Sequence, residues 1–228
     1  MNLDVIEGYV EVEGLNPILV TALHGFGTDR YKRLVDILKK EKPESESFKD
    51  IALYHSAVDM YTWEIAYKAA IAERCWLILP TMSKVDKPEN LDVPDYNLNK
   101  VYASKTPMWH RVRDLISDGV IEAIIDIHGM KNVGKWPDVC VSTCNYTSVS
   151  KSLVDDVVNY LKSKGLGVTV DYPFSGGSFI RSFGKPPKVE ALALEYKRNL
   201  RFFGSQVPII TRGVIRVVKE HLNFKRKI

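Results

Sequence analysis

The chain has 228 residues, of which 45% are hydrophobic and 26% are charged, and its formal net charge is +4. This length and composition are typical of a single folded domain, which we expect to span residues 1–228. The basic residues form no stripe interleaved with aromatic residues, and no apolar run is long enough to cross a bilayer. We therefore expect neither a nucleic acid nor a membrane as a partner.

Hydrophobic periodicity predicts strands that alternate with helices along the chain. Strands are expected at residues 9–13 (an edge strand), 18–23, 51–55, 76–79, 121–127, 139–143, 168–171 and 189–196. Helices are expected at residues 31–40, 59–74, 108–117, 150–164 and 208–224. Residues 81–107 form a long polar connection, which we expect to be functional or flexible. The alternation predicts the α/β class, with a mostly parallel or mixed sheet and helices on both faces.

Two of the predicted strands end in the same way, with a histidine followed by a glycine. The apolar run that begins at Ile18 ends at His24, and the run that begins at Ile121 ends at His128. Because ligands bind at the carboxyl ends of parallel strands, we expect both imidazoles at one edge of the sheet. Two imidazoles that meet there can share a divalent metal ion, for which zinc is the first expectation. The alternative for either residue is a hydrogen-bonded core histidine.

A third protein ligand would leave one metal position open for water, and three acidic residues are candidates. Asp59 lies where a loop meets a predicted helix, although it would also serve as a helix cap. Glu64 lies inside that helix, where a solvated charge is the alternative, and Asp29 follows the first histidine. We prefer Asp59. Asp126 lies on the same strand face as His128, so we expect it to orient that imidazole.

Glu195 lies near the end of another apolar strand, where an unpaired carboxylate is expensive to bury. A general base for a metal-activated water would explain it, and a salt bridge with Lys197 or Arg198 is the alternative. The loop 175–177, Ser175-Gly176-Gly177, is followed by Arg181. Its N–H groups and the guanidinium suit a carboxylate or an oxyanion. An ordinary glycine turn and a surface arginine are the alternative.

The cysteines Cys75, Cys140 and Cys144 predict buried structural thiols, with a metal pair at Cys140 and Cys144 as the weaker alternative. No cationic and apolar leader precedes them. We therefore expect a cytoplasmic protein whose thiols are reduced.

Five motifs, taken in order, resemble those of the N-formylglutamate amidohydrolase family within the zinc-carboxypeptidase-like hydrolases. They are His24-Gly25, Asp95-Tyr-Asn97, Asp126-Ile-His128-Gly-Met130, Asp171-Tyr-Pro-Phe-Ser-Gly-Gly177 followed by Arg181, and Ala193-Leu-Glu195 followed by Arg198. The resemblance covers residues 18–201. It implies a zinc-carboxypeptidase-like (phosphorylase/hydrolase-like) fold and a zinc-dependent hydrolase of amide bonds in small N-acyl, N-formyl-like amino acids. His24, His128 and one acidic residue would bind zinc, and Glu195 would be the base.

The chain departs from these families at three positions. Gly27 stands where carboxypeptidases have glutamate, so the third ligand stays open among the three acids. Leu98 replaces an arginine and Ala193 replaces a glutamine of the amidohydrolase family. If that arginine binds a substrate carboxylate, its role passes to a cation elsewhere, with Asn97 and the loop 175–177 as further substrate contacts. The candidate cations are Lys100, Arg111, Arg113 and Arg181, of which Arg111 and Arg181 are preferred.

Two other functions stay open. The missing arginine and glutamine favour a non-catalytic ligand-binding member of the same fold. The long connection at residues 81–107 favours a peptidase or deacylase with a wider mouth, acting on a larger substrate such as an acylated peptide. The residues do not indicate the acyl group, the amino acid of the substrate or the oligomeric state.

Overall fold

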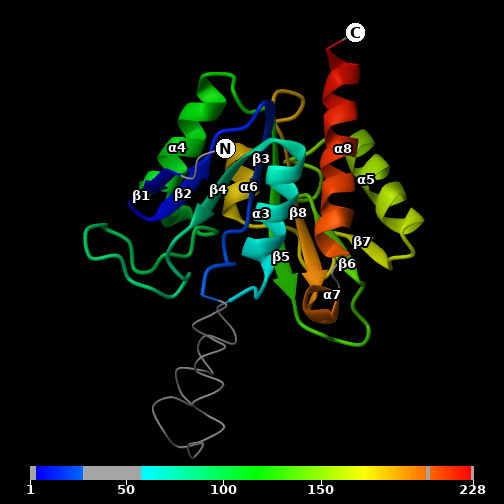
Figure 1. Ribbon diagram of the computed structural model, residues 1–228, viewed down its shortest axis with the longest axis horizontal. Coiled ribbons are helices and arrows are strands. Elements are labelled where there is room, and N and C mark those ends of the chain that lie inside the picture. Colours follow the sequence, from blue (N-terminus) through cyan, green and yellow to red (C-terminus); the bar gives the residue numbers. More distant parts are fainter. Residues whose placement is uncertain (1–3, 28–57, 204–205, 227–228) are drawn as a thin grey trace, which may run out of the picture.

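The computed structural model describes residues 4–27, 58–203 and 206–226, which form one eight-stranded sheet with helices on both faces (Figure 1). The strands are β1 (Asp4–Ile6), β2 (Tyr9–Val12), β3 (Asn16–Thr21), β4 (Cys75–Pro80), β5 (Ala123–Met130), β6 (Val139–Ser142), β7 (Val168–Val170) and β8 (Glu190–Lys197). The helices are α3 (Thr62–Glu73), α4 (Pro107–Ser117), α5 (Lys151–Ser163), α6 (Ser178–Phe183), α7 (Arg198–Phe203) and α8 (Val207–Lys225), with a 3₁₀ turn η1 (Val101–Lys105). The helix expected at 31–40 and the strand expected at 51–55 lie outside the described residues.

The sheet is mixed, with strand order β1-β2-β4-β3-β5-β8-β6-β7. The four central strands β4, β3, β5 and β8 are parallel, and antiparallel pairs join β2 to β4 and β6 to β8. The predicted α/β class is therefore confirmed. The strand expected at residues 9–13 is observed as β2, but its expected place at the edge of the sheet is wrong, because a turn at Gly8, with φ +84°, folds β1 back along the outer side of β2.

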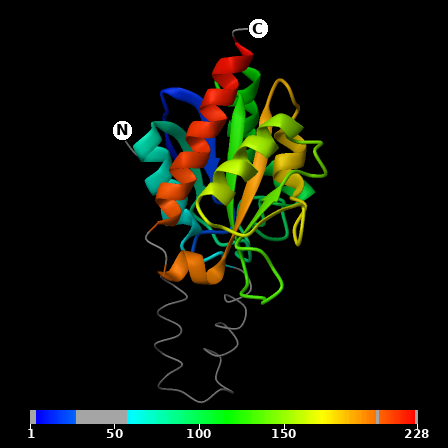
Figure 2. The same ribbon diagram turned by 90° about the vertical axis from the view of Figure 1, so that its right-hand side faces the viewer.

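Each face of the sheet carries its own apolar core, because successive side chains of a strand point to opposite faces. Val20 and Leu77 pack on the side covered by α3, α5 and α8, whereas Leu19 and Ile78 pack on the side of α4 and α6. Figure 2 looks onto the side of α5 and α8. The faces are thus fully used for packing, and the carboxyl ends of the central strands remain for chemistry. None of the helices in the described ranges has the length and apolar content that a membrane span requires.

The connection at residues 81–107 packs closely against the sheet. Its Tyr96 and Leu98 are fully buried, and Trp109 of α4 donates to the Leu98 carbonyl oxygen over 2.9 Å. The Tyr96 hydroxyl donates to the Gly8 carbonyl oxygen over 3.0 Å, which ties the connection to the N-terminal hairpin. Asn97, between these two anchors, is thereby held at a defined place beside the end of β3.

Candidate metal centre

Four of the predicted residues come from the same end of the sheet, where the central parallel strands finish. His24 follows β3, and His128 lies in β5 opposite Glu195 of β8 in the strand register. Asp59 comes from the segment before α3, where its backbone N–H donates to the His24 carbonyl oxygen over 2.8 Å. This backbone bond fastens the start of α3 beside the first histidine.

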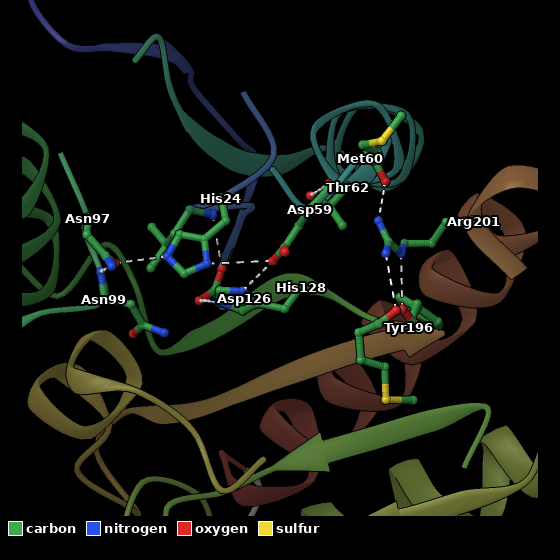
Figure 3. A network of polar contacts seen from close by, with 12 residues as sticks. His24, Asp59, Met60, Thr62, Asn97, Asn99, Asp126, His128, Tyr196 and Arg201 are labelled. Carbon is green, nitrogen blue, oxygen red and sulfur yellow. Dashed lines mark hydrogen bonds and ion pairs between the residues drawn. The ribbon is translucent and has the colours of Figure 1, made fainter. Parts of the chain in front are cut away.

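His24, Asp59 and His128 form the only group of three or more potential metal ligands within the described part of the chain (Figure 3). Their ligand atoms all lie within 4.8 Å of one another. The Asp59 Oδ2 atom lies 3.0 Å from Nδ1 of His128 and 3.6 Å from Nδ1 of His24. The structure therefore brings together the two histidines and the acid that the sequence analysis preferred.

The Asp59 carboxylate is available to the histidines because it does not cap α3. The Asp59 carbonyl oxygen instead accepts the Thr62 hydroxyl over 2.7 Å and the Thr62 N–H over 3.1 Å, and Tyr61 occupies the N-cap position. At the start of α3, Asp59 therefore accepts hydrogen bonds through its main-chain oxygen and not through its side chain. Its carboxylate faces the two imidazoles.

The outer nitrogens of both imidazoles have acceptors. Nε2 of His128 lies 2.7 Å from the Asp126 carboxylate, and Nε2 of His24 lies 3.0 Å from Oδ1 of Asn97. The Asn99 N–H also donates to Oδ1 of Asn97 over 3.2 Å, which identifies that atom as the amide oxygen. Each histidine therefore donates from Nε2 and, when neutral, presents an Nδ1 lone pair to Asp59.

This donor set fits a divalent metal ion. Two imidazole lone pairs and one carboxylate converge, an arrangement that is repulsive unless a proton or a cation is shared among them. Acceptors behind the ligating histidines, here Asp126 and Asn97, are the usual support of protein zinc sites. The leading candidate ligands are accordingly His24, Asp59 and His128.

The residues of the site differ in the direction in which their surroundings shift their pKa values. Burial raises the pKa of the Asp59 carboxyl, but hydrogen bonds to His128 and His24 outweigh it and hold that pKa well below the ordinary range. Burial lowers the pKa of His24. For His128, burial is outweighed by Asp126 and Glu195, and the pKa is raised. Burial also raises the pKa of Glu195 from 4.5 to about 7, which suits a group that exchanges protons near neutral pH.

The surroundings of Glu195 in the structure differ from the alternative of a salt bridge with Lys197 or Arg198. Lys197 donates to the carbonyl oxygen of Trp136 over 2.8 Å, and the guanidinium of Arg198 lies over the ring of Phe202. Glu195 itself is only 9% exposed. Its neighbours across the strands are His128 on one side and Cys140 on the other.

Several predicted residues lie outside this cluster. Glu64 lies within α3 and is not a member of the His–Asp–His group, and Asp29 lies outside the described residues. Arg181 is exposed on α6. Arg111 forms a two-pronged ion pair with Glu11 of β2, through its Nε (2.9 Å) and Nη2 (2.7 Å) atoms. Arg111 is thus engaged in an ion pair away from the three candidate ligands, and its contact with a substrate stays a prediction.

The predicted anion loop docks on the long connection. The N–H groups of Ser178 and Phe179 both point to Asn99, 3.3 Å from its carbonyl oxygen and from Oδ1 respectively. A Cβ atom at Gly177 would overlap the Asn99 amide. The carbonyl oxygen of Ser175 accepts the Cys144 N–H over 2.6 Å, and Gly176 adopts a φ of +104°. Gly177 therefore allows close packing against Asn99, and Gly176 against Ile180 and Cys144. Asn97 contacts His24, and its role as a substrate contact stays a prediction.

Sequence analysis did not single out Arg201. This residue of α7 lines a cavity of about 70 Å³ together with Asp59, Gly129, Lys131 and Arg198. Its guanidinium donates to backbone carbonyl oxygens of three other segments (Figure 3). The one feature of the sequence that hints at a side chain packed here is Gly129, which directly follows the second histidine and leaves space beside it. The three cysteines, in contrast, are buried and free as predicted.

Comparison with known proteins identifies this chain as similar to a family of hydrolases. Residues 110–201 match the model of the N-formylglutamate amidohydrolase family. Comparison with the curated proteins found no match. The predicted resemblance to this family, and the prediction of an enzyme of the amidohydrolase kind, are confirmed by the family match.

Solved structures show the same fold over nearly the whole chain. N-formylglutamate amidohydrolase from Ralstonia eutropha JMP134 is similar with a TM-score of 0.61 and 13% identity, covering 98% of this chain and 100% of that one. A bacteriophage poly-gamma-glutamate hydrolase is similar with a TM-score of 0.55 and 12% identity, covering 97% and 93%. The zinc-free form of YNDL is similar with a TM-score of 0.54 and 17% identity, covering 93% and 89%.

Proposed function

We propose that this N-formylglutamate amidohydrolase-like chain is a zinc-dependent hydrolase that cleaves the amide bond of a small N-acyl amino acid. His24, Asp59 and His128 would be the metal ligands, and Glu195 the general base. The observation that carries the proposal is the convergence of two Nδ1 atoms and one carboxylate beside a buried Glu195, whose pKa is raised to about 7.

His24, Asp59 and His128 would hold a divalent zinc ion, which would supply Lewis acidity for the scissile carbonyl and for a water molecule. Glu195 accepts a proton from the attacking water and delivers it to the leaving amine nitrogen. Burial favours the neutral form of Glu195 and so keeps the proton available for the second transfer. The acid Asp126 and the amide oxygen of Asn97 keep both imidazoles in the tautomer that ligation requires.

The substrate class rests on the family match and on two solved structures of similar fold. The N-formylglutamate amidohydrolase of Ralstonia eutropha JMP134 supports a formyl or other short acyl group, and the phage poly-gamma-glutamate hydrolase supports a glutamyl amide. Leu98 carries no charge and is buried in the core, so it cannot bind a substrate carboxylate as an arginine at this position would. The cation that would meet a substrate carboxylate therefore differs from that of the family.

The proposal is tested with protein stripped by a chelator and reloaded with zinc. Zinc content is measured, and amine release is followed on N-formyl and N-acetyl amino acids and on N-acylated glutamyl peptides. We expect about one zinc per chain, zinc-dependent turnover, and loss of turnover with retained zinc in Glu195→Gln. Glu220→Gln, at an exposed position of α8, is the matched control.

Three results would overturn it. A wild-type protein that binds no zinc removes the metal centre. A zinc-loaded protein that turns over no acylated substrate, while Glu195→Gln binds the same compounds as the wild type, indicates the non-catalytic binding function. Turnover of acylated peptides alone indicates the peptidase or deacylase function.

A further inference from the structure

We infer that Arg201 is a positioning residue for the candidate metal centre, because its guanidinium ties together the three chain segments that carry Asp59, His128 and Glu195. This inference rests on the proposed function. It concerns a residue that touches none of the proposed reacting atoms and acts through the main chain beside the proposed ligands and base.

The guanidinium forms hydrogen bonds to one carbonyl oxygen in each segment (Figure 3). Nη1 donates to Met60, Nη2 donates to Met130 over 3.3 Å, and Nε donates to Tyr196 over 3.1 Å. Met60 directly follows Asp59, Tyr196 directly follows Glu195, and Met130 lies two positions after His128. Since a peptide group is planar, a fixed carbonyl also fixes the orientation of the neighbouring main chain.

The guanidinium is planar and rigid, and its donors point outward in a fixed fork. One such group therefore sets the spacing of three carbonyl oxygens in a single plane. The three segments come from the loop before α3, from β5 and from β8, and Arg201 itself comes from α7. Strand pairing joins β5 to β8, but the loop before α3 lies outside the sheet, so Arg201 supplies a direct link from it to both strands.

The chain makes room for this arrangement at Gly129. A Cβ atom there would collide with the guanidinium carbon of Arg201 and with both terminal nitrogens. Gly129 is not among the glycines with positive φ, so its backbone conformation does not demand glycine. Glycine is required at position 129 because the Arg201 guanidinium occupies the space that a Cβ atom would need.

If Arg201 only linked chain segments, an uncharged side chain would do so at a lower desolvation free energy. Burial disfavours the charged form of Arg201, whereas the carboxylates of Asp59 and Glu195 favour it. Breaking such an arrangement is costly, while an apolar side chain of similar volume would pack the same space with no desolvation cost. Arg201 therefore balances the two carboxylates that it also helps to hold in position.

The test compares Arg201→Gln, Arg201→Lys and Gly129→Ala with the wild type, and Arg212→Gln is the matched control. Arg212 of α8 pairs with Glu73 of α3 over 2.9 Å, so the control removes an arginine ion pair from another part of the fold. Zinc affinity is measured by competition with a chromophoric chelator. The visible absorption of the cobalt-substituted protein reports ligand geometry, which a loss of stability alone would not change.

We expect Arg201→Gln and Gly129→Ala to weaken zinc binding by about 10- to 100-fold, the range found when groups behind metal ligands are removed, and to change the cobalt spectrum. Arg201→Lys should bind zinc hardly better than Arg201→Gln, because an ammonium group on a shorter side chain cannot reach three carbonyl oxygens. The control should keep wild-type affinity and spectrum.

Each other outcome is decisive. If the wild type binds no zinc, the proposed function itself has failed. If the wild type binds zinc and all variants match its affinity and cobalt spectrum, the inference about Arg201 is wrong and the proposed function stands. Full rescue by Arg201→Lys would show that charge alone matters. Failure of both Arg201 variants to fold would show that the residue supports the whole fold, which also rejects a positioning role.

Discussion

The buried carboxylate at position 195 should destabilise the metal-free protein, and its removal should therefore stabilise it. Glu195 is 9% exposed, and burial raises its pKa from 4.5 to about 7, with smaller contributions in the same direction from Asp59 and Asp126. A difference of about 2.5 pH units corresponds to about 3 kcal/mol between the two protonation states. Glu195→Gln removes the charge and keeps the shape.

The sign of the effect follows from proton binding. Between the unfolded value of 4.5 and the folded value of about 7, the native protein holds a proton that the unfolded chain has lost. The stability of the wild type therefore falls as pH rises through this window, and above it the full cost of burying the charge remains. Glutamine does not titrate, so the advantage of the variant should grow across the window and level off at about 3 kcal/mol.

The assay is urea unfolding with a chelator present, at about pH 5 and about pH 8.5, with Glu220→Gln as the control for loss of an exposed charge. We expect the gain of Glu195→Gln to be small at the lower pH and large at the higher one. Saturating zinc should reduce the gain, because a nearby cation stabilises the carboxylate. An advantage that is equal at both pH values would refute the argument from burial.

Three further substitutions test two residues that support the candidate ligands and one ion pair outside the site. Asp126→Asn should weaken zinc binding by about 10- to 100-fold in a chelator competition, because the proton on Nε2 of His128 loses its charged acceptor; unchanged affinity would contradict this role. Asn97→Leu should weaken zinc binding by about 10-fold, since His24 is then free to change tautomer, and nitrogen-15 chemical shifts of the imidazole should reveal that change. Arg111→Met should lower the free energy of unfolding by about 2 kcal/mol, because it leaves the Glu11 carboxylate without its ion pair, while kcat/KM for N-acyl amino acids stays at the wild-type value. A large loss of kcat/KM in this variant would restore Arg111 as a substrate contact.

Patterns within one segment predicted much of the fold and of the site. The apolar runs before His24 and His128 mark buried parallel strands, and strand alternation alone placed Asp126 on the same face as His128. The helix expected at residues 208–224 is observed as α8, because its apolar residues recur at helical spacing. These features depend on neighbours in the sequence.

The features that were missed depend on contacts between distant segments. Asp59 was preferred over Glu64 from the sequence, but the backbone bond to His24 that holds it beside the histidines is encoded by no local pattern. Arg111 was offered beside Arg181 as a substrate-binding cation, but the sequence does not show that Glu11 of β2, 100 positions earlier, forms an ion pair with it. Arg201 lies in a short helix after the last strand, where an arginine would ordinarily be exposed.

The four residues of the candidate site are contributed by segments spread over most of the chain, and this has a consequence for when zinc can bind. A zinc finger uses ligands close in sequence, so the ion can capture the unfolded chain and drive its folding. Here the His24 and His128 segments meet only after β3 has been inserted between β4 and β5, which requires long-range parallel pairing and is a slow event. Zinc should therefore load after the sheet has formed. A nascent or proteolytically shortened chain that lacks β5 should bind the ion no better than an unstructured peptide.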